Sequence, residues 1–175
     1  MRGQIILSHG SLSSPDATKV SALAALAESL GWNTQRPDYR DDDALGHGAS
    51  VVPRLERLRA AMRATEGPAV LVGSSMGAFV SGLASLELPV AGLFLLATPE
   101  RIPGYHAAFD LRAEVPTLML HGWRDETCPV EGVLAFAGER KLPLLLLDDD
   151  HRLSTSVDAV AAQFRLFLER LAASA

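Results

Sequence analysis

A serine between two glycines is the first feature of this chain that could carry chemistry. The segment Gly73-Ser74-Ser75-Met76-Gly77 fits the pattern Gly-x-Ser-x-Gly, and Ser75 is its central residue. It directly follows the apolar run 69–72 and precedes a helical pattern over 78–86. Glycines at these positions let the chain turn sharply from strand to helix and leave the serine hydroxyl exposed at the tip. The pattern therefore predicts that Ser75 is a nucleophile.

Two further residues could activate that nucleophile. A serine hydroxyl needs a base within hydrogen-bond reach, and a third group must hold the base in one tautomer. Asp125 follows the apolar run 117–120, and His151 follows the apolar run 144–147. The chain order serine, aspartate, histidine is the one that accompanies this type of serine turn. The three residues predict acyl transfer to water, with esters or thioesters as the favoured substrates.

The elements that must position these residues alternate between strands and helices. Short apolar runs at 4–7, 69–72, 90–96, 117–120 and 144–147 suit strands buried on both faces of a parallel sheet. Helical patterns at 20–30, 51–62, 78–86 and 157–171 separate or follow them. The alternation requires one more strand at 32–37, and its polarity and Pro37 predict an edge position.

The alternation predicts one α/β domain over residues 1–175. Its architecture is a three-layer sandwich around a mostly parallel, doubly wound sheet of about six strands. Binding sites in such folds lie beyond the carboxyl ends of the strands, which is where Ser75, Asp125 and His151 are expected.

Taken together, these segments resemble the α/β-hydrolase superfamily. The resemblance rests on residues 7–11 (Leu-Ser-His-Gly-Ser), 73–77 and 121–125 (His-Gly-Trp-Arg-Asp), and on His151. It implies that Ser75 is the nucleophile, that His151 is the general base and then the acid, and that Asp125 orients the imidazole. It also implies an oxyanion hole formed by the backbone N–H groups of Ser11 and Met76. The chain starts at what resembles the third strand of the eight-stranded family plan, so we expect a truncated version of that fold.

The sequence departs from the family pattern just before His151. Many relatives carry a glycine two residues before the histidine, where this chain has Asp149, so Asp148, Asp149 or Asp150 could compete with Asp125 for the imidazole. Otherwise the aspartate runs 41–43 and 148–150 are expected to be solvated loop residues. No metal site is expected at 148–151, because contiguous residues rarely converge on one ion.

The remaining histidines and the cysteine are expected to serve other roles. His121 belongs to a turn that has a structural role in relatives. His9 is expected to support the loop that carries the Ser11 N–H. His47 and His106 are expected to be exposed loop residues, and Cys128 a packed thiol.

The length of one loop suggests what the site accepts. Fewer than 20 residues separate the strand that ends at Ala97 from the strand that begins near Pro116, too few for a substantial lid domain. We therefore expect an open pocket and a small acyl substrate. Four side chains are predicted to line it: Leu12, Tyr105, Phe109 and Trp123. A serine peptidase and a non-catalytic binding or scaffold protein that retains the fold remain the alternatives.

Composition excludes other classes of protein. The chain has 175 residues, 48% of them apolar and 21% charged, as in ordinary globular proteins. Its formal charge of −5 without clustered basic residues argues against a nucleic-acid partner. Its apolar runs are far shorter than the roughly 20 residues that span a bilayer. With no secretory pattern and one cysteine, Cys128, we expect a cytoplasmic protein that uses no cofactor; the oligomeric state is left open.

Overall fold

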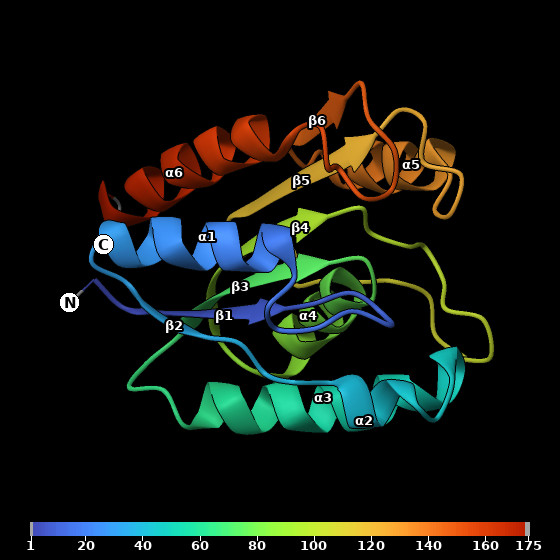
Figure 1. Cartoon of the computed structure of the whole chain (residues 1–175), viewed down its shortest axis with the longest axis horizontal. Coiled ribbons are helices and arrows are strands. Elements are labelled where there is room, and N and C mark those ends of the chain that lie inside the picture. The colour runs from blue at the N-terminus through green and yellow to red at the C-terminus, as the bar shows by residue number, and fades with distance from the viewer. Residues whose placement is uncertain (1, 174–175) are drawn as a thin grey trace.

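Six strands pair in parallel to form one open sheet in the computed structural model, which describes residues 2–173. Their order in the sheet is β2-β1-β3-β4-β5-β6, and in Figure 1 their arrows point the same way. The strands are β1 (Gln4–Ser8), β2 (Asn33–Gln35), β3 (Ala69–Ser74), β4 (Val90–Leu96), β5 (Thr117–Gly122) and β6 (Leu144–Leu147).

Helices cover both faces of this sheet. On one face lie α1 (Thr18–Ser29) and α6 (Val157–Ala173), and on the other lie α3 (His47–Arg63), α4 (Met76–Glu87) and α5 (Val130–Arg140). In Figure 1, α1 and α6 lie next to each other, whereas α3 lies away from them, below β1. A short helix, α2 (Arg40–Asp43), precedes α3. The predicted three-layer α/β architecture is confirmed.

The central strands are mostly apolar because both of their faces are buried. In β1, Ile5 and Leu7 belong to the core under α1 and α6, whereas Ile6 belongs to the core on the other face. Successive strand side chains point to opposite faces, so a continuous apolar run contributes side chains to the cores on both faces. This is why continuous apolar runs, rather than alternating apolar and polar residues, predicted the strands correctly.

The polar strand β2 lies at the sheet edge, as predicted. Within the described chain its one partner strand is β1, from Gln4 against Asn33 to Ile6 against Gln35. The strand is shorter than the predicted 32–37, and Pro37 lies beyond it, since a proline has no N–H to donate to a ladder.

The prediction for the first aspartate run was wrong. Residues 41–43 lie in α2, and both Asp42 and Asp43 are buried. Asp42 pairs with Arg57, and Asp43 pairs with Arg54, which is fully buried on α3. Arginines on α3 compensate the cost of burying these carboxylates, a long-range pairing that a local charge pattern does not show.

No helix within residues 2–173 is both long and apolar enough to cross a bilayer.

Candidate active site

The turn between β3 and α4 holds Ser75 in a strained conformation. Its φ of 54° and ψ of −117° are unusual for a residue with a side chain. The Ser75 N–H donates to the Leu96 carbonyl at 2.8 Å, which fixes the turn to β4. A Cβ on Gly73 would lie 2.4 Å from the Gly77 carbonyl oxygen, and one on Gly77 would lie 2.0 Å from the Ser8 carbonyl oxygen. Both glycines are therefore needed for the close packing of this turn.

A chain of hydrogen bonds runs from Ser75 through His151 to Asp125. The Ser75 hydroxyl lies 3.0 Å from Nε2 of His151, and Nδ1 of His151 lies 2.7 Å from Oδ2 of Asp125. An ionised carboxylate can only accept, so Nδ1 carries the hydrogen and Nε2 accepts the serine O–H. The structure thus brings together the three residues that the sequence singled out from three separate loops.

Asp125 is buried and surrounded by donors. Its Oδ1 accepts the backbone N–H groups of Thr127 at 3.0 Å and Cys128 at 2.7 Å. His121 lies in the same turn: its Nε2 is 2.7 Å from the Cys128 carbonyl and 3.2 Å from Oδ2 of Asp125. Burial works against the charged carboxylate, but hydrogen bonds from His151 and the Cys128 amide outweigh it and lower the pKa of Asp125. The carboxylate therefore stays ionised beside the imidazole.

The three consecutive aspartates before His151 accept hydrogen bonds from groups other than the His151 imidazole. Asp149 is buried, and its two oxygens accept the backbone N–H groups of Asp150 and Thr155. Asp148 is exposed and pairs with an arginine. The expectation of a fully solvated run was thus wrong for Asp149, which organises the loop that carries His151.

A cavity of about 660 Å³ opens beside Ser75 and His151. Its wall also includes Ser11 and Met76, the two residues predicted to supply an oxyanion hole. The remaining lining residues come from three segments: His47 at the start of α3, residues 99–103 after β4, and Thr127, Cys128, Pro129, Glu131 and Gly132 around the start of α5.

The backbone N–H groups of Ser11 and Met76 are available to a ligand. Neither donates to another group within residues 2–173. The oxyanion loop, defined as residues 9–12, approaches the serine closely, since a Cβ on Gly10 would lie 3.5 Å from Cβ of Ser75. Two unengaged amide donors on the wall beside a serine are the arrangement that stabilises an oxyanion in acyl transfer.

The four side chains predicted to line the pocket lie away from the cavity wall. Leu12 is 82% exposed and Trp123 is 54% exposed. Phe109 is buried in the core against Phe79, and Tyr105 packs edge-on against the same ring. The prediction chose the correct loops but not the side chains, because sequence position does not reveal which way a loop residue points.

Several wall residues were missed by sequence reasoning. The segment 99–103 directly follows β4, and the rule that sites lie beyond strand carboxyl ends could have marked it. His47 is exposed but belongs to α3 rather than to a loop, and its Nδ1 lies 3.1 Å from Oγ of Ser11. No local sequence pattern predicts that contact, because it joins residues 36 positions apart.

Among residues 2–173, one group of side chains could hold a metal ion. Donor atoms of Asp125, Cys128 and His151 lie within 4.8 Å of one another. However, Asp125 and His151 are hydrogen-bonded to each other, and burial raises the pKa of the Cys128 thiol to about 12. Since thiolate is the form that binds metals, this donor set suits proton transfer to and from Ser75 better than metal binding.

Comparisons with known proteins place the chain among α/β hydrolases. No family model and no curated protein matches it. A solved structure of an α/β-superfamily protein from Xanthomonas campestris pv. campestris has 43% sequence identity and a TM-score of 0.91, covering 96% of this chain and 99% of that one.

Two more distant solved structures share the fold. Est1E from Butyrivibrio proteoclasticus has 17% identity and a TM-score of 0.74, covering 98% of this chain and 88% of its own. Mouse alpha/beta hydrolase domain-containing protein 10 has 19% identity and a TM-score of 0.76, covering 98% and 92%. The Xanthomonas protein is similar enough, over nearly its full length, to show more than a shared fold, and we conclude that this chain belongs to the α/β-hydrolase superfamily.

Proposed function

We propose that this protein is a serine hydrolase that cleaves a small ester or thioester through a covalent acyl-enzyme. The observation that carries the proposal is the hydrogen-bonded chain Ser75–His151–Asp125 at the wall of a cavity. Membership in the superfamily supports hydrolytic activity in general, whereas the residues and the substrate class are inferred from this geometry.

In the first half of the proposed reaction, Ser75 attacks the substrate carbonyl carbon while His151 takes the hydroxyl proton through Nε2. Asp125 holds the imidazole and stabilises the imidazolium that forms. The N–H groups of Ser11 and Met76 donate to the oxyanion, and each donor of this kind is worth about 3 kcal/mol. The imidazolium then gives its proton to the leaving alcohol or thiol, and an acyl group remains on Ser75.

In the second half, water replaces the leaving group. His151 takes a proton from the water as its oxygen attacks the acyl carbon. The bond to Ser75 Oγ then breaks, and the proton passes to that oxygen. The products are a carboxylic acid and the free enzyme, so no co-reactant other than water is required.

The cavity supports a small-molecule substrate. A volume of about 660 Å³ lies within the roughly 300–1,000 Å³ typical of sites for small ligands. Ile102 and three prolines on its wall, Pro99, Pro103 and Pro129, suit an apolar acyl or alcohol group. Esters and thioesters are favoured over amides, because their leaving groups need less protonation help.

Nitrophenyl esters of increasing acyl length test this proposal. We expect burst kinetics on short acyl chains, an acyl adduct on Ser75 in quenched samples, and no turnover above background with Ser75→Ala. A strong preference for long fatty acyl chains would contradict the small substrate.

Two alternatives are separated by the same assays. A serine peptidase would turn over matched peptide anilides faster than the nitrophenyl esters. A non-catalytic scaffold would give the same background rate for the natural chain and for Ser75→Ala.

A further inference from the structure

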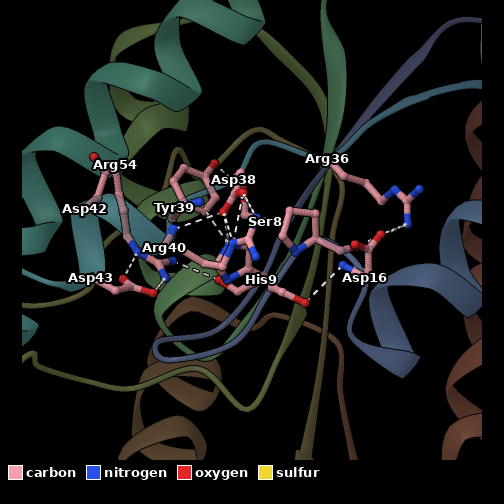
Figure 2. A network of polar contacts seen from close by, with 12 residues as sticks. Ser8, His9, Asp16, Arg36, Asp38, Tyr39, Arg40, Asp42, Asp43 and Arg54 are labelled. Atoms are coloured by element: carbon pink, nitrogen blue, oxygen red, sulfur yellow. Dashed lines mark hydrogen bonds and ion pairs between the residues drawn. The ribbon is translucent and has the colours of Figure 1, made fainter.

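The oxyanion loop is held by a side chain that lies on α3, away from the nucleophile. Arg54 is fully buried, and its guanidinium donates to two consecutive carbonyls of the loop: that of His9 at 2.8 Å and that of Gly10 at 3.0 Å. Figure 2 shows this guanidinium among the buried polar groups next to the loop. Arg54 lies on the apolar face of α3 with Val51, Leu55 and Leu58, an unusual place for an arginine.

Asp43 completes the hydrogen-bond network that holds the oxyanion loop. It accepts two hydrogen bonds from Arg54, each at 2.7 Å, and its Oδ2 also accepts the Leu12 N–H at 3.1 Å. Leu12 has a φ of 55°, a conformation that costs a side-chain-bearing residue free energy and needs such support. The Arg54–Asp43 pair thus fixes the backbone on both sides of Ser11.

The hydrogen bonds to Gly10 determine where the Ser11 N–H points. The Gly10 carbonyl and the Ser11 N–H belong to one peptide group, and among the described residues no peptide bond is cis. In a trans peptide the C=O and N–H point in opposite directions. Arg54 therefore pulls the carbonyl toward α3 and aims the N–H away from α3, on the side where Ser11 lines the cavity.

His9 donates to the same carbonyl. Its Nε2 accepts the Tyr39 N–H at 3.0 Å, so Nδ1 carries the hydrogen and donates to the Gly10 carbonyl at 2.7 Å. Burial lowers the pKa of His9, which keeps this neutral tautomer in place. Two donors on one carbonyl polarise the peptide group and strengthen its N–H as a donor.

We propose that Arg54, held by Asp43, is a positioning residue that aims and polarises the Ser11 N–H for the oxyanion. This inference rests on the proposed function. A buried ion pair is a poor source of stability, because two charges must be removed from water, so stabilising the fold does not by itself account for its place beside the loop.

A neighbouring pair on the same two helices provides a matched control. Arg57 lies one turn along α3 and donates to both oxygens of Asp42. The pair has the same two-point geometry and joins the same helices, but the Arg57 side chain is 46% exposed and donates no hydrogen bond to residues 9–12. Arg57→Met therefore removes an ion pair between the same two helices without removing a hydrogen bond from the oxyanion loop.

The first test compares Arg54→Lys with Arg57→Met in kinetics per active site. Lysine keeps the charge next to Asp43, but its single ammonium cannot replace the planar guanidinium that bridges two carbonyls and a carboxylate. With competent sites counted by fluorophosphonate titration, we expect Arg54→Lys to lower kcat roughly 10- to 100-fold with KM within about twofold, since complete loss of one oxyanion donor costs 10²–10³. Affinity for a boronic acid that forms a tetrahedral adduct should fall by the same factor, and Arg57→Met should stay within about twofold in every measurement.

The second test uses NMR on the folded proteins. In the natural chain, the boronate adduct should move the amide protons of Ser11 and Met76 downfield. In Arg54→Lys the shift at Ser11 should shrink while the shift at Met76 stays, a difference that a general loss of stability does not produce. The natural chain alone keeps the proposal falsifiable if the variant fails to fold, because a Ser11 proton that does not respond to the adduct would overturn it.

The outcomes separate this inference from the proposed function. An active enzyme whose kcat per titrated site is unchanged in Arg54→Lys would overturn the role of Arg54 and leave the serine hydrolase intact. A natural chain that neither hydrolyses esters nor reacts with the fluorophosphonate would overturn both.

Discussion

The hydroxyl of Ser75 lies 3.0 Å from Nε2 of His151, although the two residues follow strands that are not neighbours in the sheet. Ser75 follows β3 and His151 follows β6, with β4 and β5 between them. The contact depends on the loop after β6 reaching back over two strand ends. Asp149 organises that loop through its hydrogen bonds to backbone N–H groups. Asp125, in the turn after β5, accepts a hydrogen bond from Nδ1 of His151.

Asp125→Asn should lower kcat about 10⁴-fold while leaving substrate binding nearly unchanged, because a neutral amide favours the wrong imidazole tautomer. Steady-state kinetics on a short nitrophenyl ester check this result. Asp148→Asn is the control, since that exposed carboxylate does not contact His151. Equal activity of the two variants would show that Asp125 does not orient the base.

Asp125 should also contribute to acid stability. Its lowered pKa means that the ionised form stabilises the fold above the unfolded pKa of about 3.9, and that this contribution disappears as pH falls through the lower folded value. The difference in free energy of unfolding between the natural chain and Asp125→Asn should therefore be constant near neutral pH and shrink below about pH 4. Urea unfolding at several pH values measures it, and a difference that grows with acid would be inconsistent with an ionised, stabilising carboxylate.

Lys19 on α1 should destabilise the protein at neutral pH. Burial lowers the pKa of its amine to about 8, despite nearby carboxylates that include Asp149. Between that value and the unfolded pKa of about 10.4, the unfolded chain binds more protons, so stability should rise with pH. Lys19→Met should raise Tm at pH 7, by about 2–4 °C for each kcal/mol gained, and this advantage should fade toward pH 10.5.

Lys141→Met is the matched control for Lys19, because that lysine is exposed at the end of α5. The difference in Tm should change with pH more for Lys19→Met than for Lys141→Met. A Lys19→Met variant that behaves the same way would show that the Lys19 amine is not perturbed.

Cys128 should react slowly with iodoacetamide although it lines the cavity. With a pKa of about 12, its thiolate at pH 8.5 is roughly 10³-fold scarcer than that of an ordinary cysteine. Labelling should therefore be slow in the native protein and fast in urea, as followed by mass spectrometry. Rapid modification of the folded chain would contradict the environment described for this thiol.

The fold and the three side chains that meet at the candidate site were predictable because their signals are local. Strands that are buried on two faces require continuous apolar runs. The Gly-x-Ser-x-Gly turn can be recognised from five consecutive residues. The position of Asp125 and His151 after strands was enough to bring them to one edge of the sheet. The polar strand β2 lies at the sheet edge, where a strand is not buried on both faces, and Pro37 follows just beyond it.

The cavity wall and the buried charges were not predictable in this way. Side chains such as Trp123 and Phe109 lie in the right loops, but one points outward and the other enters the core. The run 41–43 looks like a solvated loop until Arg54 and Arg57 are brought against it by the packing of α2 on α3. These relationships depend on tertiary contacts between segments that carry no shared pattern.

Mapping a fluorophosphonate adduct is the most direct measurement of the central claim. The reagent phosphonylates only a serine whose hydroxyl is activated by a neighbouring base. We predict one adduct, on Ser75, that is absent in Ser75→Ala and strongly slowed in His151→Ala. An unlabelled natural chain over pH 7 to 9, or an adduct on Ser74 or another serine, would contradict the account.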